Sequence, residues 1–434
     1  MAHRRIVSRS EIAMTAYARK GMATGAFSGM VWGLDGAILG VAMAMSPFTG
    51  GVSIITAPLA GAALHDGFAA LWLLLINLFT GKSGEIAKTL RSRPGRLVCL
   101  AALLGGPVGM AGYLMSIANA GAAYAMAVSA IYPALGALMA RVFLKERISA
   151  RVWAGIAVCV AGAIVTGYAP PEQAAAGGFY TGIAFALLAA TGWAAEGVLS
   201  TYGMDLLDPD IAINIRQAVS FAVYLVIVVP LAGALPVLGR AVVSKSMGVV
   251  ALAGLAGAVS FLAWYRSLNM CGVGRAMALN ITYALWGIVF GLLFFGLELS
   301  AGLVAGALMI TAGALTIVTE NRSTGTLRAV ESKPATGIAD VAVKDAGALP
   351  VKMLILYVSA TVGPVSAGVL LEEINKYMPG VRGYDPGRLE DNLLPLQMAG
   401  LIERAENGVN AEGENGDLFK VTGRGLDMIK RNMM

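Results

Sequence analysis

The sequence has few charged residues and few cysteines. Asp, Glu, Lys and Arg make up 13% of its 434 residues, against about 25% in a soluble domain. Cys99, Cys159 and Cys271 stand far apart without metal-ligand spacing, so we expect packing roles, no disulfide and no metal site. With 57% hydrophobic residues and a mean hydropathy of +0.72, the chain is predicted to be an integral membrane protein.

Apolar stretches of membrane-spanning length recur up to Thr319. A bilayer core of about 30 Å needs about 20 residues of helix, and ten stretches meet that length. The predicted fold class is therefore an all-α membrane protein with a small soluble addition. The predicted spans are residues 22–44, 57–80, 97–118, 121–143, 151–169, 178–200, 211–234, 247–268, 275–297 and 301–319.

Lysine and arginine are distributed unevenly between the predicted loops. Most fall in the amino-terminal segment 1–21 and in the loops after the second and fourth spans, whereas the opposite side has only Arg240 and Lys245. Cytoplasmic loops carry the basic excess, and the first span lacks an evident cleavage site. We therefore expect a multi-pass membrane protein with both termini cytoplasmic and basic loops facing anionic lipid.

A short pattern occurs in both halves of the chain. Residues 32–36 read Trp-Gly-Leu-Asp-Gly, and residues 193–197 read Trp-Ala-Ala-Glu-Gly. These two patterns are 161 residues apart, whereas a shift of 151 residues aligns 125–127 with 276–278 and 161–163 with 312–314, so the first copy is longer between its first two spans. Five spans per copy is an odd number, so the second copy enters the membrane from the opposite face. The sequence thus predicts two inverted five-helix repeats, residues 22–169 and 178–319.

Inverted repeats of this kind typically hold a substrate near the membrane midplane and alternate between two mirror-related conformations. The alternative is that the repeat only records ancestry and the protein is a pore or a receptor, although no stretch resembles a selectivity filter. We favour a secondary transporter, which is not an enzyme and needs no cofactor.

The acidic members of the repeated pattern are the first candidates for a binding site. A carboxylate at membrane depth is costly and usually faces a cavity or a partner. Glu196 in such a site attracts both a proton and an organic cation, although a protonated glutamate bonded to a neighbouring helix is the alternative. Asp35, its counterpart, is equally consistent with a site, a gate or an internal salt bridge.

Aromatic residues occupy matched positions in the two halves. Trp32 and Trp193 each lie within one turn of a carboxylate, and Tyr132 and Tyr283 correspond at the 151 offset. Aromatic faces together with a carboxylate recognise quaternary ammonium groups. These rings are predicted to line one cavity, and ordinary helix packing is the alternative for each.

Two polar pairs also correspond between the halves. His65-Asp66 aligns with Arg216-Gln217 at the same offset. Arg216 could neutralise Asp66 or Glu196 and so set how readily the carboxylate releases its proton. A structural ion pair near the membrane edge is the alternative interpretation.

Several runs resemble bacterial choline permeases, which are EamA-type members of the drug/metabolite transporter superfamily. The likeness covers residues 22–319 and departs at Asp35, where that family has a small residue. The runs that carry it are Gly106–Met110, Ser129–Ala134, Phe143–Lys145, Trp193–Ser200, Ile215–Gln217, Tyr224–Val228 and Asn280–Tyr283.

This resemblance implies proton-coupled choline uptake across a bacterial inner membrane, with the cation in a central aromatic pocket. Asn280 and Gln217 join the candidate site through it, and His65-Asp66 matches a histidine–aspartate pair of that family. The extra charge at Asp35 could change the substrate to another cationic amine or alter the coupling. The substrate-binding residues implied are Trp32, Trp193, Glu196, Tyr132, Tyr283, Asn280 and Gln217.

The composition changes after Arg322. Residues 323–349 are predicted to be a linker, and residues 350–434 a small soluble domain. Helical patterns at 351–358, 366–377 and 386–399 precede a predicted hairpin of 401–403 with 418–421, and Thr422 is a candidate cap of a last helix. This order resembles a winged-helix domain.

DNA binding is not favoured for this domain, because residues from 323 onward hold twelve Lys or Arg against fourteen Asp or Glu. We expect a protein-interaction or dimerisation module instead. For the whole chain, importing choline or a related quaternary amine is the favoured function. Its rivals are an exporter of cationic drugs or metabolites and a membrane-bound sensor whose soluble domain is the output.

Overall fold

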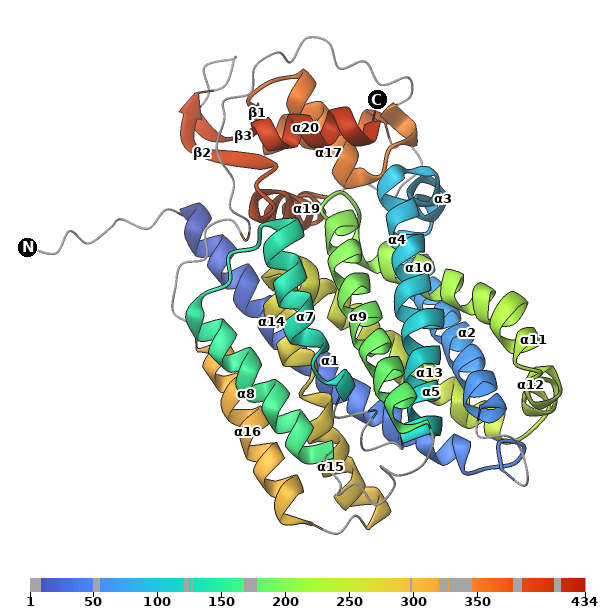
Figure 1. Cartoon of the computed structure of the whole chain (residues 1–434). Helices are drawn as coiled ribbons and strands as arrows, with labels where there is room; N and C mark the ends of the chain where they lie inside the picture. Colours follow the sequence, from blue (N-terminus) through green and yellow to red (C-terminus); the bar gives the residue numbers. More distant parts are fainter. Residues whose placement is uncertain are drawn as a thin grey trace, which may run out of the picture.

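The structure is a computed structural model of the chain. It describes residues 9–49, 55–120, 125, 128–167, 178–296, 299–319, 327, 346–377, 385–409 and 415–433. A bundle of long helices forms the body of the molecule, and a smaller domain of helices and strands covers the end of the bundle where the first helix begins (Figure 1).

The first part of the bundle runs from Arg9 to Gly167. Its first helix begins at Arg9, well before the predicted first span, so part of the predicted amino-terminal segment is helical. The elements are α1 (Arg9–Met43), α2 (Thr56–Phe79), α3 (Gly84–Arg91), α4 (Arg93–Leu103), the π-helix η1 (Leu104–Met110), α5 (Ala111–Ala120), α7 (Tyr132–Met139), the π-helix η2 (Ala140–Leu144) and α8 (Ala150–Gly167).

The second part of the bundle runs from Phe179 to Val318. The short helix α12 in this part was not predicted. The elements are α9 (Phe179–Met204), α10 (Pro209–Val223), the π-helix η3 (Tyr224–Val228), α11 (Val229–Leu231), α12 (Leu235–Val242), α13 (Ser246–Cys271), α14 (Val273–Asn280), α15 (Tyr283–Phe295) and α16 (Ala301–Val318).

Eight helical segments among the described residues are long and apolar enough to cross a membrane. They coincide with eight of the predicted spans. Two further apolar helices, Tyr132–Leu144 and Ala150–Thr166, lie at the fourth and fifth predicted spans but are shorter. The chain is thus a mostly helical multi-pass membrane protein, and the count of ten spans stays a prediction.

Two helices that correspond at the 151 offset, α8 and α16, pack against each other through glycines. A Cβ on Gly155 would lie 3.0 Å from the Gly313 carbonyl oxygen, and one on Gly162 would lie 2.9 Å from the Gly306 carbonyl oxygen. In turn, a Cβ on Gly313 would lie close to the Gly155 carbonyl oxygen, and one on Gly306 would lie close to the Gly162 carbonyl oxygen. Small residues allow such close approach of membrane helices, and reciprocal contacts are typical of elements related by a two-fold axis. The inverted repeat itself stays a prediction.

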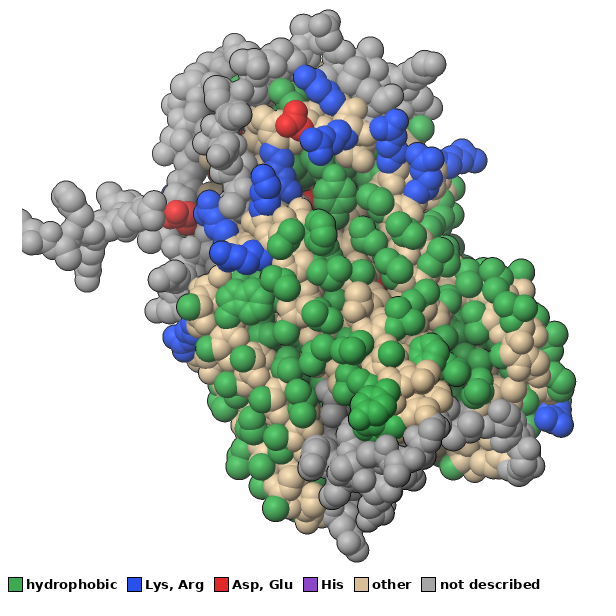
Figure 2. All heavy atoms as spheres, viewed as in Figure 1, with side chains coloured by type: hydrophobic (Ala, Val, Ile, Leu, Met, Phe, Trp, Pro, Cys, Tyr) green, Lys and Arg blue, Asp and Glu red, His purple; other side chains and the backbone are tan. Residues whose placement is uncertain are grey.

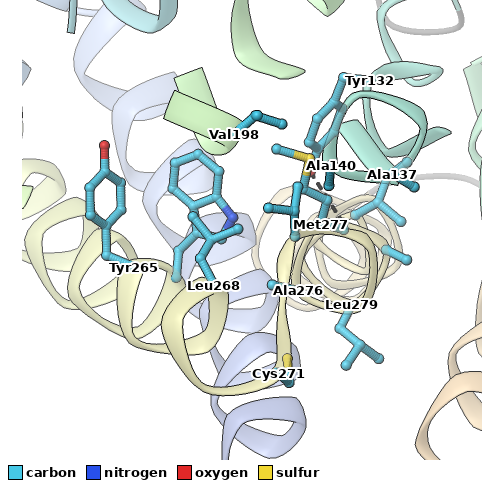
Figure 3. Close-up of a cluster of buried hydrophobic side chains, with 14 of the residues drawn as sticks. Tyr132, Ala137, Ala140, Val198, Tyr265, Leu268, Cys271, Ala276, Met277 and Leu279 are labelled. Carbon is cyan, nitrogen blue, oxygen red and sulfur yellow. Dashed lines mark hydrogen bonds between the residues drawn. The ribbon is translucent and has the colours of Figure 1, made fainter. Parts of the chain in front are cut away.

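In the core between the two parts of the bundle, large side chains pack against glycines. Met277 of α14 packs against Gly136 of α7 and Gly197 of α9, where a Cβ would overlap its thioether. Figure 3 shows Met277 pointing toward Tyr132 and Val198. The three cysteines are free thiols within α4, α8 and α13, as packing residues should be.

The carboxy-terminal domain packs helices against a three-stranded antiparallel sheet of order β1-β3-β2. Val365 pairs with Phe419, and Ile402 pairs with Val421. Its elements are the 3₁₀ helix η4 (Ala346–Ala348), α17 (Val351–Thr361), β1 (Val365–Ser366), α18 (Ala367–Tyr377), α19 (Pro386–Met398), β2 (Ile402–Val409), β3 (Asn415–Val421) and α20 (Gly423–Met433).

The helices and the hairpin predicted for this domain are present. The cap is confirmed as well, because the Gly425 N–H donates to Thr422 Oγ1 at 3.1 Å at the start of α20. The two-residue strand β1 was not predicted. Most of the predicted linker, residues 323–349, lies outside the described residues, as do Met126 and Ala127 of the aligned repeat.

The visible surface of the bundle is largely apolar, whereas lysine and arginine side chains gather where the bundle meets the carboxy-terminal domain (Figure 2). An apolar belt bordered by basic residues is the surface expected of a protein that sits in a bilayer. The carboxy-terminal domain thus lies beyond the basic border, at the end of the bundle where α1 begins.

Candidate functional site

A cavity of about 460 Å³ lies inside the bundle, and both predicted halves contribute residues to it. Gln217 alone of the predicted site residues is not part of its lining; its buried amide donates to the lining residue Asp66 at 3.3 Å. The predicted residues that line the cavity are Trp32, Asp35, His65, Asp66, Tyr132, Trp193, Glu196, Arg216, Asn280 and Tyr283.

Glu196 of α9 is bound by Arg216 of α10. The guanidinium Nε and Nη2 lie 2.7 and 3.2 Å from the two carboxylate oxygens. The Tyr265 hydroxyl also donates to Glu196 at 3.1 Å, and the Gln217 side chain accepts from Arg216. Because Glu196 and Arg216 are buried and face each other through two hydrogen bonds, they form a charge-assisted pair whose geometry is fixed.

Asp35 of α1 is bound by His65 of α2. Nε2 of His65 lies 3.1 Å from Asp35 Oδ1, and Nδ1 lies 3.5 Å from Asp66 Oδ1. The imidazole therefore stands between two carboxylates, one on each side of its ring. Asp66 is held in turn by the Ser220 hydroxyl, which donates to Oδ2 at 2.7 Å.

These two clusters meet at Asp66 and Gln217, which correspond at the 151 offset. The hydrogen bond between them joins α2 to α10. The chain of contacts therefore runs without a break from Asp35 through His65, Asp66 and Gln217 to Arg216 and Glu196. Within the described residues, no group of three or more His, Cys, Asp or Glu side chains is arranged to hold a metal ion.

Aromatic rings stand beside each acidic cluster. The Trp193 ring lies 5.5 Å from Tyr113 and 6.1 Å from Tyr132, centroid to centroid. On the other side, the Trp32 ring lies 4.9 Å from Phe261. The cavity thus has an aromatic wall next to each carboxylate, which is the combination that recognises cations without hydrogen-bond donors.

Hydrogen bonds hold some of these aromatic rings in place. The Trp193 indole N–H donates to the Gly105 carbonyl at 3.1 Å. The Tyr132 hydroxyl donates to Asn280 Oδ1 at 3.0 Å, and the Asn280 amide donates to Ser28 Oγ at 2.9 Å. Asn280 therefore orients Tyr132 while lining the cavity itself.

The π-helical segment η1 brings backbone to the cavity wall. It contains Pro107, which has no N–H to donate; π-helical segments are frequent at functional sites. A Cβ on Gly105 would overlap the Glu196 carboxylate, and one on Gly106 would overlap Ser220. Only glycine permits this approach, which explains the need for glycine in this run.

Several residues of the site were missed from the sequence. Tyr113, Phe261 and Trp264 line the cavity, while Ser220 and Tyr265 hold its carboxylates. Tyr113 and Trp264 correspond at the 151 offset. A search for paired aromatics at that offset would have found these two, whereas Ser220 and Tyr265 carry no comparable signal.

Comparison with known proteins identifies the family. The model of the EamA-like transporter family matches residues 20–168 and again residues 180–319. The chain belongs to the EamA-like transporter family. Its members are transporters, so this chain is a membrane transporter. The two matched stretches have nearly the bounds of the predicted halves.

Individual relatives of this EamA-like transporter are distant. Protein LicB of Haemophilus influenzae is 30% identical over 219 residues, which are 50% of this chain and 73% of that protein. A solved structure, titled only as the crystal structure of a protein, is similar with a TM-score of 0.53 at 18% identity. The match covers 68% of this chain and 94% of that one. It shows a shared fold alone.

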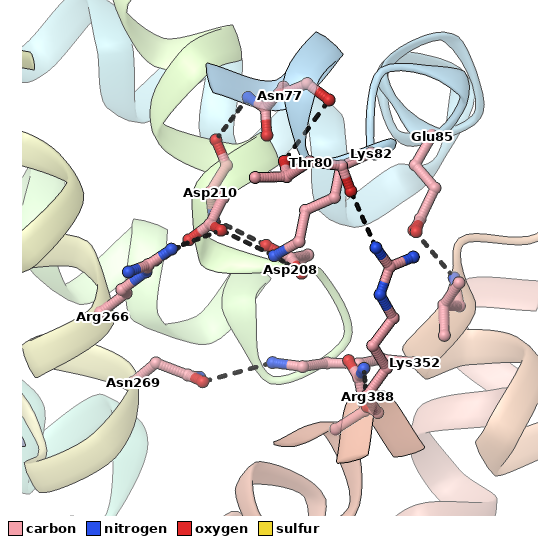
Figure 4. Close-up of polar contacts among 12 residues, drawn as sticks. Asn77, Thr80, Lys82, Glu85, Asp208, Asp210, Arg266, Asn269, Lys352 and Arg388 are labelled. Atoms are coloured by element: carbon pink, nitrogen blue, oxygen red, sulfur yellow. Dashed lines mark hydrogen bonds and ion pairs between the residues drawn. The ribbon is translucent and has the colours of Figure 1, made fainter. Parts of the chain in front are cut away.

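A second polar cluster lies where the carboxy-terminal domain meets the bundle (Figure 4). Asp210 Oδ2 and Oδ1 accept from Lys82 at 2.6 Å and from Arg266 at 2.7 Å. Lys352 of α17 donates to the Met204 carbonyl, the last residue of α9, at 3.1 Å. Glu85 accepts at 3.1 Å from the N–H of Val351, the first residue of α17. Each of these two contacts places a charge at the helix terminus that favours it.

Burial changes the proton affinity of two groups in this junction. It raises the pKa of the Glu85 carboxyl from 4.5 to about 7, and it lowers the pKa of the Lys352 ammonium from 10.5 to about 8. In both cases the loss of water disfavours the charged form. A cavity of about 300 Å³ lies beside these groups, and none of the sequence predictions identified it.

Proposed function

We propose that this transporter takes up choline or a related quaternary amine in a proton-coupled process. The observation that carries the proposal is the central cavity, in which aromatic walls stand beside an excess of acidic groups. Three carboxylates, on Asp35, Asp66 and Glu196, face one guanidinium and one imidazole.

The chemistry of a quaternary amine fits this arrangement. Such a cation has no N–H, so proteins bind it through aromatic faces, at about 2 kcal/mol for each desolvated contact, and through negative charge. The rings of Trp193 and Trp32 stand on opposite acidic clusters of one cavity. Both rings line the cavity that a small cation would enter.

The choice of choline within this class rests on the cavity and on the sequence runs that resemble choline permeases. Asp35 departs from that resemblance and adds a negative charge to the cavity. Betaine and carnitine, which carry a carboxylate, should therefore be poorer substrates than choline. Other cationic amines are the natural competitors.

The experiment is uptake of radiolabelled choline into proteoliposomes that contain the purified full chain. An imposed pH gradient should drive accumulation that a protonophore abolishes. Protein-free liposomes provide the background, and unlabelled choline, betaine and carnitine are the competitors. Absence of choline uptake, with transport of betaine or carnitine instead, would overturn the assignment of substrate.

The remaining proposals concern orientation and the carboxy-terminal domain. We place the protein in a bacterial inner membrane with both termini in the cytoplasm, supported by the basic border at that end (Figure 2). We propose a winged-helix-like fold for the carboxy-terminal domain, and its order of helices followed by a hairpin and a last helix supports this proposal. We propose that it binds a protein partner or a second copy rather than nucleic acid, because its acidic residues outnumber its basic ones.

Deleting residues 323–434 separates the rival functions. A transporter should retain substrate flux without them, whereas a membrane-bound sensor would lose its response. Export of cationic drugs or metabolites is distinguished by the direction of flux under a fixed pH gradient. Net accumulation of the cation inside the proteoliposomes supports import, and net extrusion supports the exporter.

A further inference from the structure

The two acidic clusters of the cavity have the same construction with different bases. In each, a carboxylate on the first helix of a matched stretch binds a base on the second helix: Asp35 with His65, and Glu196 with Arg216. His65 and Arg216 correspond at the 151 offset. A guanidinium keeps its proton in proteins, whereas an imidazole can release one. Of the two pairs, only Asp35–His65 has a base that can exchange a proton.

The surroundings of His65 match its doubly protonated form. A neutral imidazole has one N–H and one lone pair, whereas an imidazolium has two N–H donors. Both ring nitrogens of His65 face carboxylate oxygens, at 3.1 and 3.5 Å. A neutral ring would turn its lone pair toward one of these negative oxygens. The bridge between Asp35 and Asp66 therefore stabilises the charged ring.

The other elements packed against His65 leave this balance unchanged. The rings of Trp32 on α1 and Phe261 on α13 lie 6.3 Å away and carry no charge. Gly257 of α13 gives the ring space, since a Cβ there would lie 2.6 Å from Nε2. Asp35 and Asp66 face His65 directly. Arg216 of α10 lies over the Phe261 ring at 5.5 Å, and its charge is balanced by its ion pair with Glu196.

We infer that the proton linked to cation binding resides on His65, in a carboxylate–imidazole–carboxylate bridge that Asp35 completes. The inference rests on the proposed function and specifies its coupling site. An incoming quaternary ammonium competes with the imidazolium for the negative charge of Asp35 and Asp66. The proton leaves a ring nitrogen for water as the cation enters, so no bond other than N–H is broken.

The sequence makes this inference directly measurable. The chain has two histidines, His3 and His65, so nitrogen NMR of histidine-labelled protein in nanodiscs contains two imidazole signals. The variant His3→Ala assigns the signal of His65. At pH 7 we expect His65 to have protons on both ring nitrogens, and saturating choline to remove one of them.

The variant Asp35→Asn tests the role of the second carboxylate. Without its charge the ring should have a single proton at pH 7, and choline should no longer change the signal. Asp35→Glu is the matched control and should retain two protons. A neutral His65 in the wild type, or an unchanged doubly protonated ring in Asp35→Asn, would overturn the inference.

A second measurement separates failure of this inference from failure of the proposed function. Calorimetric titration of choline in two buffers with different protonation enthalpies counts the protons released per bound cation. We expect up to one proton in the wild type and none in His65→Gln. Choline binding without proton release at any pH from 6 to 8 overturns the inference but leaves the assignment of choline as the substrate unchanged. Absence of choline binding overturns the proposed function, while the NMR state of His65 still decides the inference.

Discussion

The two acidic clusters of the central cavity occupy corresponding places but differ in what their bases can do. Asp35 faces a histidine, whose imidazole can take up and release a proton. Glu196 faces an arginine, which cannot. The backbone arrangement thus fixes where the charges lie in each half, and one side chain per half decides whether the charge can change. This difference assigns proton exchange to one half and a permanent ion pair to the other.

The largest effect is expected from removing the permanent cation. In Arg216→Leu the hydroxyl of Tyr265 is the one donor left to the Glu196 carboxylate among the residues that the structure describes. Loss of one partner of a buried ion pair typically costs about 3–5 kcal/mol. We expect a marked fall in the thermal unfolding temperature in detergent, together with loss of choline uptake.

A double variant provides the control for this experiment. Glu196→Gln combined with Arg216→Gln removes both charges and retains polar groups of similar length. It should recover most of the lost stability without restoring uptake. An Arg216→Leu protein as stable as the wild type would show that this pair is not a fixed element, and the contrast between the halves would fail.

A smaller effect is expected from the aromatic walls. Trp193→Ala should weaken choline binding at least tenfold, because a desolvated cation–π contact contributes about 2 kcal/mol. Trp32→Ala makes the same change in the other half and should also weaken binding. Equilibrium binding of labelled choline measures both.

Trp153 of α8 provides a matched control for the two tryptophans. It packs against the core and is not part of the cavity lining, so Trp153→Ala should leave choline affinity unchanged. If only one of the two cavity variants binds more weakly, the cation lies in one half rather than between them.

The sequence contained most of the information for the cavity residues. Carboxylates at membrane depth and aromatics matched between halves both follow from the cost of polar groups in lipid and from the repeat. The 151 offset aligns His65 with Arg216, and this alignment predicts that the two side chains make equivalent contacts. Arg216 was predicted to neutralise either Asp66 or Glu196, and the structure pairs it with Glu196.

The details that escaped the sequence depend on three-dimensional packing. A hydropathy pattern does not reveal that Leu104–Met110 is π-helical, because that local change depends on Pro107 and on which side chains donate hydrogen bonds to the freed carbonyl oxygens. Ser220 was missed because a serine in an apolar helix has no distinctive spacing. The two-residue strand β1 is too short for a periodic pattern to predict.

The junction with the carboxy-terminal domain was also outside the reach of sequence patterns. Glu85 and Val351 meet across 266 positions of the chain, and no periodicity links them. Lys352 lies in an otherwise apolar helix. From the sequence alone, its charge is expected to face solvent. Its burial follows only once the domain lies against the bundle.

The junction with the carboxy-terminal domain serves as a control for both halves of the cavity. Its buried charges hold two parts of the chain together but do not line the central cavity. Glu85→Gln should therefore leave choline uptake unchanged while altering the pH dependence of docking. In the docked state the pKa of Glu85 is raised to about 7 from 4.5. The docked form thus binds the proton more tightly, so docking is favoured below pH 4.5 and weakens as the pH rises to about 7.

Hydrogen exchange of α17 (Val351–Thr361) measures this docking locally. One proton changes the free energy of opening by at most about 1.4 kcal/mol per pH unit, so exchange in the wild type should accelerate between pH 5 and 7 beyond the intrinsic chemical rate. Lys352 does not contribute in this window, because its pKa of about 8 leaves it protonated whether docked or free. Glu85→Gln should remove the pH dependence, and Glu85→Asp should retain part of it. If the Glu85→Gln variant keeps the wild-type dependence of exchange on pH, another group titrates at the junction. If the variant loses choline uptake, buried charges outside the cavity also control transport. The contrast between the two halves of the cavity would then not be specific to them.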